Sequence, residues 1–206
     1  MKGILCFGDS LTFGVGETPT KGWVGRLKEY YEPKGEHNCV FNLGIRGDST
    51  NELVKRIDTE LKARIKYIYP QDNYLVIISI GINDSRRIGN SKQIQTNLKL
   101  FKKNIIKLSK ISKKYTEKII FIGITPVDEK KTLPYEDTYF SNKNIKEYNK
   151  IIENICKKNN ILFINLFKIL KKKYKKLLKD GIHLNSTGYN QCFKEIKSNL
   201  IKYNLL

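Results

Sequence analysis

The chain has 206 residues, of which 40% are hydrophobic and 29% are charged, and its formal net charge at pH 7 is +19. These proportions are typical of a soluble globular protein, and the length suits one domain with a full core. The longest apolar run, residues 74–78, is far shorter than the roughly 20 residues of a membrane-spanning helix. Gly8 and Asp9 interrupt the first apolar run too early for a signal peptide. We therefore predict a single cytoplasmic domain, residues 1–206, with no membrane span.

The cysteines and lysines restrict the partners that we expect. The four cysteines form no C-x-x-C pair and no metal-like cluster, which indicates a reduced protein without a bound metal or cofactor. The positive charge has two interpretations, a nucleic-acid site or lysines that only fill exposed helix positions. Lysines occur throughout the chain and are densest at residues 171–176. This distribution favours weak, salt-dependent attraction to polyanions over a specific nucleic-acid site. The sequence gives no indication of the oligomeric state.

Short apolar runs alternate along the chain with segments of helical period. Runs rich in β-branched residues predict strands at residues 3–7, 39–43, 74–80, 118–124 and 161–165. The third run is apolar at nearly every position, as in a parallel strand that is covered on both faces. This alternation predicts an α/β sandwich with a parallel sheet. One long irregular connection, residues 125–139, contains two prolines and is typical of a lid or binding loop.

Four segments carry apolar residues at the spacing of one helix face. The motif Ser49-x-x-Glu52 before the first of them is a capping box, and Asn185 or Ser186 is the expected N-cap of the last. We interpret the four stripes as core faces: Val54, Ile57, Leu61 and Ile65; Ile94, Leu98, Phe101, Ile105 and Leu108; Ile145, Tyr148, Ile152 and Ile155; and Tyr189, Phe193, Ile196, Leu200 and Tyr203.

Polar, glycine-containing turns follow the first three predicted strands, and another precedes the last helix. In a parallel sheet, ligands bind outside the carboxyl ends of the strands. Each turn alone is also explained by ordinary turn or capping chemistry, but their convergence at one edge favours a site. The turns are Gly8-Asp9-Ser10, the segment 42–50 with Gly47-Asp48, Gly81-Ile82-Asn83-Asp84, and Asp180-Gly181-Ile182-His183.

The residue types in these turns are those of nucleophilic catalysis. A serine needs a base within hydrogen-bond reach, and the chain has only two histidines. Because His37 precedes the second strand, at the wrong end of the sheet, His183 is the candidate base for Ser10. Asp180 can orient the imidazole of His183. The expected oxyanion donors are the backbone amides of Ser10 and Gly47 and the side-chain amide of Asn83.

These four motifs, in this order, resemble the sequence blocks of the SGNH (GDSL) hydrolases, from residue 4 to about 190. The resemblance implies a flavodoxin-like, three-layer α/β/α fold with five parallel strands in the order 2-1-3-4-5. It also implies ester hydrolysis through a covalent acyl-serine, with Ser10, Gly47, Asn83 and His183 in the four named roles and Asp180 completing the triad. Gly44 competes for the second block, but Gly47-Asp48 fits the family pattern better.

We therefore predict a serine esterase or acylhydrolase that acts on small-molecule esters. A carbohydrate O-deacetylase, a thioesterase and a lysophospholipase use the same machinery and remain alternatives. An alternative of another class is a catalytically silent polyanion-binding protein. Asp9, Leu11 and Trp23 are candidate substrate contacts, although Trp23 also suits the core. The lysines of residues 171–176 either attract anionic substrates or form a solvated helix face.

Overall fold

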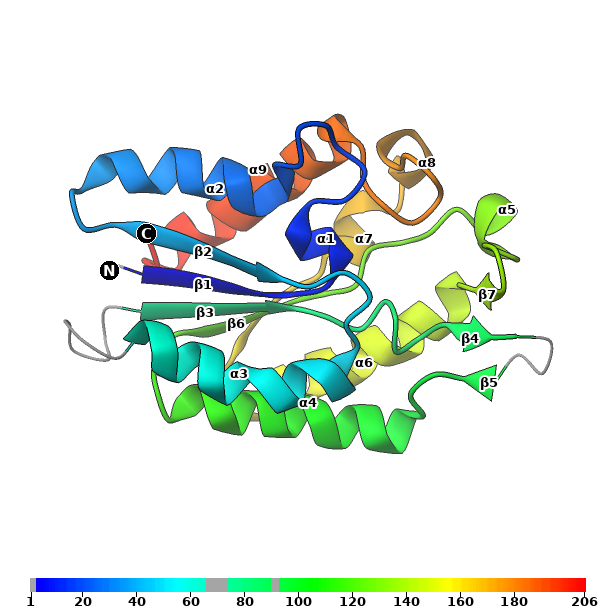
Figure 1. The fold of residues 1–206 in the computed structure, drawn as a ribbon, viewed down its shortest axis with the longest axis horizontal. Helices are drawn as coiled ribbons and strands as arrows, with labels where there is room; N and C mark the ends of the chain where they lie inside the picture. The colour runs from blue at the N-terminus through cyan, green and yellow to red at the C-terminus, as the bar shows by residue number, and fades with distance from the viewer. Residues whose placement is uncertain (1–2, 66–73, 90–92) are drawn as a thin grey trace.

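The central sheet has five parallel strands (Figure 1). The computed structural model describes residues 3–65, 74–89 and 93–206. The spatial order of the strands is β2-β1-β3-β6-β8, which is 2-1-3-4-5 along the chain and confirms the expected topology. The strands are β1 (Gly3–Gly8), β2 (Cys39–Gly44), β3 (Tyr74–Ser79), β6 (Ile119–Ile122) and β8 (Leu162–Ile164).

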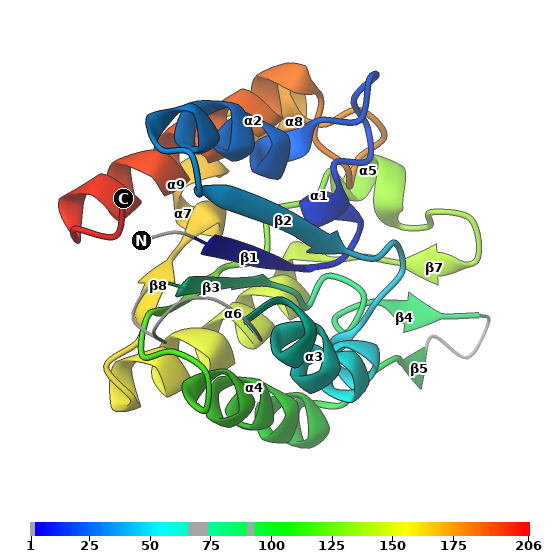
Figure 2. The same cartoon turned by 60° about the vertical axis from the view of Figure 1, so that its left-hand side comes forward.

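Long helices cover both faces of this sheet, so the predicted three-layer α/β/α arrangement is confirmed (Figures 1 and 2). On one face lie α2 (Gly22–Tyr31) and α9 (Ser186–Lys202), which pack against each other. On the other face lie α3 (Thr50–Ile65), α4 (Leu98–Lys113) and α6 (Asn142–Lys158). Within the described residues, no helix is both long enough and apolar enough to span a membrane.

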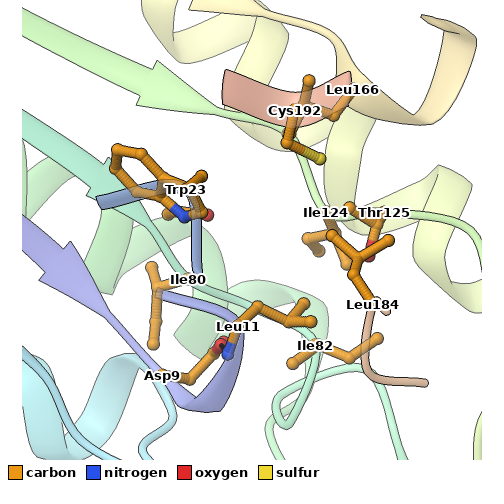
Figure 3. A pocket seen from close by; sticks show the side chains of 12 residues that line it. Asp9, Leu11, Trp23, Ile80, Ile82, Ile124, Thr125, Leu166, Leu184 and Cys192 are labelled. Atoms are coloured by element: carbon orange, nitrogen blue, oxygen red, sulfur yellow. Dashed lines mark hydrogen bonds between the residues drawn. The ribbon is translucent and has the colours of Figure 1, made fainter. Parts of the chain in front are cut away.

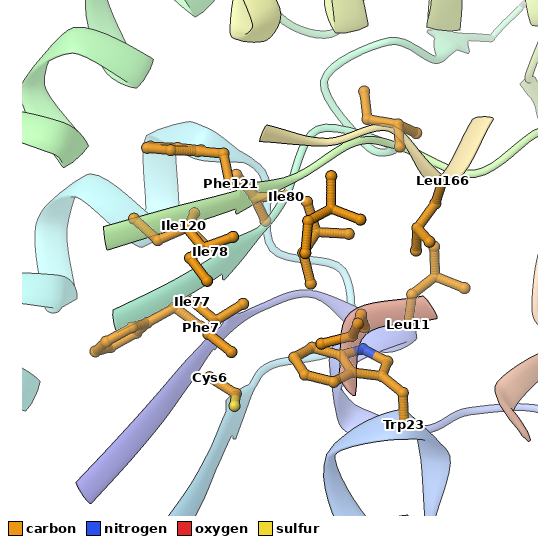
Figure 4. Packing of buried hydrophobic residues seen from close by; sticks show 14 of the residues in the cluster. Cys6, Phe7, Leu11, Trp23, Ile77, Ile78, Ile80, Ile120, Phe121 and Leu166 are labelled. Carbon is orange, nitrogen blue, oxygen red and sulfur yellow. The ribbon is translucent and has the colours of Figure 1, made fainter. Parts of the chain in front are cut away.

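The core lies on both sides of β3, as its continuous apolar sequence predicts. Leu75, Val76, Ile77 and Ile78 have no exposed surface. Figure 4 shows side chains of β1, β3 and β6 packed together. Burying each such side chain contributes about 1.5–3 kcal/mol to folding, so the central strands carry much of the stabilisation.

Side-chain caps fix where two of the long helices begin. The Ser49 amide donates to Oε2 of Glu52 at 2.9 Å, and the Asn51 amide donates to the Ser49 hydroxyl at 3.2 Å, which confirms the capping box. At α9, Oδ1 of Asn185 accepts from the Gly188 amide at 2.9 Å, so Asn185 is the N-cap.

Two of the predicted stripes extend too far. Ile94 is not helical but lies in β5 (Gln93–Ile94), because Asn97 caps α4 by accepting from the Leu100 amide at 2.9 Å. Leu98, the first residue of α4, is 40% exposed. Tyr203 follows the end of α9 and is 50% exposed, so it does not belong to the core. In both places the apolar spacing continues beyond the hydrogen bonds that define the helix.

The predicted irregular connection, residues 125–139, is partly ordered, so that prediction was wrong for part of its length. It contains α5 (Glu129–Thr132) and β7 (Thr138–Tyr139). β7 pairs antiparallel with β4 (Arg87–Ile88), which pairs with β5 in a small second sheet. Strands of two residues are too short to give a periodic signal. The same holds for the short helices α1 (Ser10–Phe13), α7 (Leu166–Leu170) and α8 (Tyr174–Leu177).

Candidate active site

Ser10 is the first residue of α1 and directly follows the strand and cap that position it. β1 ends at Gly8, and the Asp9 carboxylate then caps α1 by accepting from the Leu11 amide at 2.9 Å. A side chain at position 8 would collide with the Ser79 carbonyl oxygen at 2.2 Å, so only glycine fits against β3. Ser10 therefore lies at the carboxyl end of β1, in the middle of the sheet edge.

The structure brings Ser10, His183 and Asp180 together across 173 residues of sequence. The Ser10 hydroxyl lies 2.9 Å from Nε2 of His183. Nδ1 of the same imidazole lies 2.7 Å from Oδ2 of Asp180. Both distances are those of hydrogen bonds, so a serine, an imidazole and a carboxylate form one connected chain. The second histidine, His37, lies before β2 at the opposite end of the sheet, as expected.

Asp180 is held in place by backbone groups of its own turn. Its Oδ1 accepts from the amides of Ile182 and His183 at 2.9 and 2.8 Å. Burial by itself raises the pKa of Asp180. The hydrogen bonds from the His183 side chain and from these amides outweigh that effect and hold the pKa well below its usual range. The carboxylate is thus ionised at neutral pH and faces Nδ1 of the imidazole.

Gly47 and Asn83 lie on the loops after β2 and β3 and line one cavity together with Ser10 and His183. The Asn83 side-chain amide donates to the Asp48 carbonyl at 2.8 Å, which joins the two loops. Gly47 has φ +84°, a left-handed conformation that favours glycine, and no atom crowds its Cβ position. Gly44, the competing glycine, instead packs against the backbone of α1, where a Cβ would lie 2.3 Å from the Phe13 nitrogen.

Polar side chains in the protein interior hold these loops in place through hydrogen bonds. Asp84 has no exposed surface and accepts from the Thr50 amide at 2.9 Å and from the Thr50 hydroxyl at 2.6 Å. Arg56 donates to Asp48 at 2.8 Å and to the carbonyls of Gly8 and Leu43, at the ends of β1 and β2.

The cavity in front of Ser10 has a volume of about 460 Å³. That size is within the range of small-molecule sites. Its outer wall comes from the small second sheet, with Ile88 on β4 and the turn before β7. This turn includes Tyr135, whose hydroxyl donates to Oδ2 of Asp180 at 3.3 Å. The sequence did not reveal Tyr135, since the only available signal was its position in the long connection after β6.

Asp9, Leu11 and Trp23, the predicted substrate contacts, lie behind the catalytic cavity. They line a small, mostly apolar cavity behind Ser10, which Figure 3 shows between α2, the ends of the strands and α9. Its volume of about 20 Å³ has room for about one water molecule and none for an acyl chain. Trp23 is 3% exposed. In this conformation the three side chains support the site rather than face it.

Comparison with known proteins identifies the family. The model of the GDSL-like lipase/acylhydrolase family matches residues 6–191. The chain belongs to this family. It is therefore a hydrolase of ester bonds, and the predicted family resemblance is confirmed. The matched residues include both Ser10 and the Asp180–His183 turn.

Several relatives of this GDSL-like hydrolase resemble it over nearly its whole length. It is 27% identical to the uncharacterized protein YpmR of Bacillus subtilis (strain 168), over 94% of this chain and 79% of that protein. A lipase/acylhydrolase from Enterococcus faecalis is 25% identical, with a TM-score of 0.76 over 97% of this chain and 95% of that one. The acetylxylan esterase Axe2 from Geobacillus stearothermophilus shares the fold, with 21% identity and a TM-score of 0.71 over 97% and 94% of the chains.

The side chains that could ligate a metal ion are scattered in the described parts of this hydrolase. In the segments that the structure describes, no group of three or more His, Cys, Asp or Glu side chains is placed to hold a metal ion. All four cysteines are free thiols, and three of them are buried.

Asp9 makes the stability of the protein dependent on pH. Burial raises the pKa of this carboxyl to about 7, against about 3.9 in an unfolded chain. From pH 4 to 7 the folded state retains a proton that the unfolded state has released, so stability falls as pH rises through this window. Asp9→Asn keeps a capping oxygen and stays neutral. Between pH 5 and 8 the free energy of unfolding should fall by about 2–3 kcal/mol more in the wild type than in this variant.

Urea unfolding at several pH values measures this difference. Asp128→Asn is the matched control for the cap itself, because Asp128 caps α5 through the Lys130 amide from a less buried position. Parallel pH profiles for the wild type and Asp9→Asn would contradict a raised pKa at Asp9.

Proposed function

We propose that the protein is a serine esterase that cleaves small carboxylic esters through an acyl-serine intermediate. The observation that carries the proposal is the hydrogen-bonded chain from the Ser10 hydroxyl through His183 to Asp180. A serine hydroxyl is a weak nucleophile until a base takes its proton, and Nε2 of His183 lies within reach to do so. Asp180, ionised and bonded to Nδ1, selects the tautomer in which Nε2 is free to accept that proton.

The reaction proceeds in two half-reactions. In the first, Oγ of Ser10 bonds to the ester carbonyl carbon while its proton moves to Nε2 of His183. The tetrahedral intermediate then expels the alcohol, which takes the proton from His183, and the acyl group stays on Ser10. In the second, a water molecule gives its proton to His183 and attacks the acyl-serine. The carboxylic acid leaves as Oγ of Ser10 regains its proton.

Three groups that line the catalytic cavity are the proposed donors to the substrate oxygen as it becomes negative. Ser10 is the first residue of α1, so its amide has no acceptor within the helix. The Gly47 amide lies on the facing loop, in the same cavity. Asn83 uses one hydrogen of its side-chain amide on the Asp48 carbonyl and keeps a second for the substrate. Donors that are fixed before the reaction stabilise the transition state without reorganisation.

The cavity volume favours short acyl and alcohol groups over long lipid chains. About 460 Å³ admits a small ester, and the apolar cavity behind Ser10 offers no room for a long acyl chain in this conformation. Sugar acetates fit the same space, so a carbohydrate O-deacetylase is the second candidate. The shared fold of Axe2, itself an acetylxylan esterase, is compatible with it. A screen of esters graded by acyl length, run beside acetylated sugars and an acyl-thioester, separates these substrates.

Ser10→Ala tests the proposed nucleophile. Hydrolysis of 4-nitrophenyl acetate should fall by about six orders of magnitude, as when a member of a connected triad is removed. A fluorophosphonate probe should label the wild type and leave the variant unlabelled. Ser198→Ala, an exposed serine of α9, is the matched control. A Ser10→Ala protein as active as the wild type would refute the mechanism. An unlabelled wild type that retards nucleic acid at physiological salt would favour the polyanion-binding alternative.

Asn83→Ala tests the oxyanion site. We expect kcat to fall about 100- to 1000-fold with little change in KM, because the lost hydrogen bond forms mainly in the transition state. The same change removes the bond to the Asp48 carbonyl, so thermal unfolding must accompany the kinetics. Asn104→Ala controls for structural disturbance, since Asn104 donates to Thr50 and Asn51 below the site. An equal loss of kcat in both variants would argue against an oxyanion role.

Tyr135→Phe tests whether the outer wall positions the triad. The change removes the hydroxyl that donates to Oδ2 of Asp180, the oxygen that also faces His183. Without this donor the carboxylate is held less firmly against the imidazole, so kcat should fall about two- to tenfold while KM stays unchanged. Tyr174→Phe, on α8, is the control, and an unchanged kcat in Tyr135→Phe would exclude the positioning role.

A further inference from the structure

A second cavity adjoins the catalytic one, and Arg46 lines both. The second cavity has a volume of about 490 Å³, and its walls come from residues 13–20, Arg46 and Lys179. In both views the loop after α1, drawn in blue, lies beside the orange segment that connects α8 to α9 (Figures 1 and 2). Gly16 in this loop lies against His183 and Leu184, since a Cβ there would be 2.4 Å from the Leu184 carbonyl oxygen. The second cavity therefore lies directly beside the catalytic one.

The charge in this second cavity is positive. Arg46 and Lys179 are both exposed, and neither side chain has an ion pair or hydrogen bond within the described parts of the chain. The acidic side chain in the same wall, Glu17, is bound to Arg26 at 2.5 and 2.7 Å and to the Gly22 amide at 3.0 Å. The hydrogen bond from Arg26 lowers the pKa of Glu17 to about 2, and the same arginine neutralises its charge. Two cations thus face the cavity without a counter-ion.

The far wall of the catalytic cavity has the opposite character. Glu136 and Asp137, on the turn before β7, line the catalytic cavity but not the second one. Arg86 in that wall donates from Nε to Oε1 of Gln95 at 2.6 Å, and the two carboxylates outnumber its single positive charge. Burial lowers the pKa of Arg86, and the Asp137 carboxylate beside it opposes that shift. An anionic group in the active site is therefore repelled from this wall and attracted towards Arg46.

We propose that Arg46 and Lys179 form a subsite for a negatively charged group of the substrate, so that the preferred esters carry a carboxylate or phosphate close to the scissile bond. The guanidinium of Arg46 can bind such a group through two parallel hydrogen bonds, and Lys179 adds a second positive charge. Arg46 directly precedes Gly47, the proposed donor to the ester carbonyl oxygen. An anionic group bound by Arg46 therefore lies next to the ester carbonyl. The lysines of residues 171–176 strengthen the long-range attraction, whereas Arg46 and Lys179 make the contact.

This proposal rests on the esterase function, and two matched substrate pairs test it. On the acyl side, 4-nitrophenyl butyrate is compared with mono-4-nitrophenyl succinate, which has the same number of acyl carbons and one carboxylate. On the alcohol side, phenyl acetate is compared with 4-acetoxybenzoate. In at least one pair the wild type should have the higher kcat/KM for the anionic ester, mainly through a lower KM. The preference should weaken with added salt.

The variants Arg46→Gln and Lys179→Gln test whether the preference for anionic esters arises from this subsite. We expect Arg46→Gln to lower the ratio of anionic to neutral kcat/KM roughly tenfold or more, and the double variant to abolish the preference. Lys172→Gln, an exposed lysine of the neighbouring basic run, is the matched control and should lower the ratio by less than about twofold, because it affects only the long-range attraction. Equal rates within both pairs in the wild type, or a preference that survives the double variant, would overturn the proposal.

Measuring ester binding to the inactive Ser10→Ala variant distinguishes a failure of the anion subsite from a failure of the proposed esterase function. In at least one of the two pairs, Ser10→Ala should bind the anionic ester more tightly than its neutral partner, and adding the two subsite substitutions should remove the difference. If the wild type hydrolysed none of the four esters while this difference remained, the esterase proposal would fail and the anion subsite would stand. If all four esters were hydrolysed and no difference in binding were found, the esterase proposal would stand and the anion subsite would fail.

Discussion

The candidate site depends on one largely buried cation. Arg56, on α3, donates to the carbonyls at the ends of β1 and β2 and to the Asp48 carboxylate, so a single guanidinium joins two strand ends to the loop after β2. A bare strand end exposes carbonyls that need donors, and a buried arginine needs acceptors and a counter-charge. Here Nε and Nη2 of Arg56 make these bonds, while its Nη1 has no hydrogen-bond partner among the described residues. The loop that Arg56 fixes carries Gly47, and the Asp48 carbonyl on it receives the Asn83 amide. Three strand ends thereby become one rigid surface behind the serine.

The catalytic geometry depends on the path that the chain takes after the end of β1 and on the separate turn that carries His183. Glycine at position 8 lets β1 approach β3 closely, and the Asp9 cap then starts a helix whose first residue is Ser10. His183 comes from a turn before α9, on the other side of the serine, and its carboxylate partner lies three residues earlier. A serine on the sheet and a base on a separate turn meet only when both layers of helices are packed. The hydrogen bond of 2.9 Å between them is thus a product of the whole fold.

Features with a local physical cause were predictable from the sequence. The sheet strands could be read from apolar runs, the capping box from Ser49 and Glu52, and the edge of the sheet from four glycine-containing turns. The position of Asn185 as N-cap needed the structure, because Ser186 offers the same chemistry. The second sheet could not be foreseen, since β4, β5 and β7 have two residues each and their order depends on pairing between segments about 50 residues apart. Tyr135 was missed for that reason: its turn reaches Asp180 through the pairing of β7 with β4 and through the hydrogen bond from the Asp128 amide to the Gly181 carbonyl.

The site therefore has two kinds of wall with different origins. The residues around the reacting atoms lie at strand and helix ends that the core holds rigidly, and their types suffice to suggest the reaction. The walls that face the rest of the substrate come from residues 13–20, from Arg46 and from the turn before β7. These segments bring together charges that are distant in sequence, with acids on one side and unpaired cations on the other. An electric field across the cavity arises from that placement, and it gives a charged substrate a preferred direction. The identity of the substrate is thus encoded in loop packing, whereas the reaction is encoded in motifs.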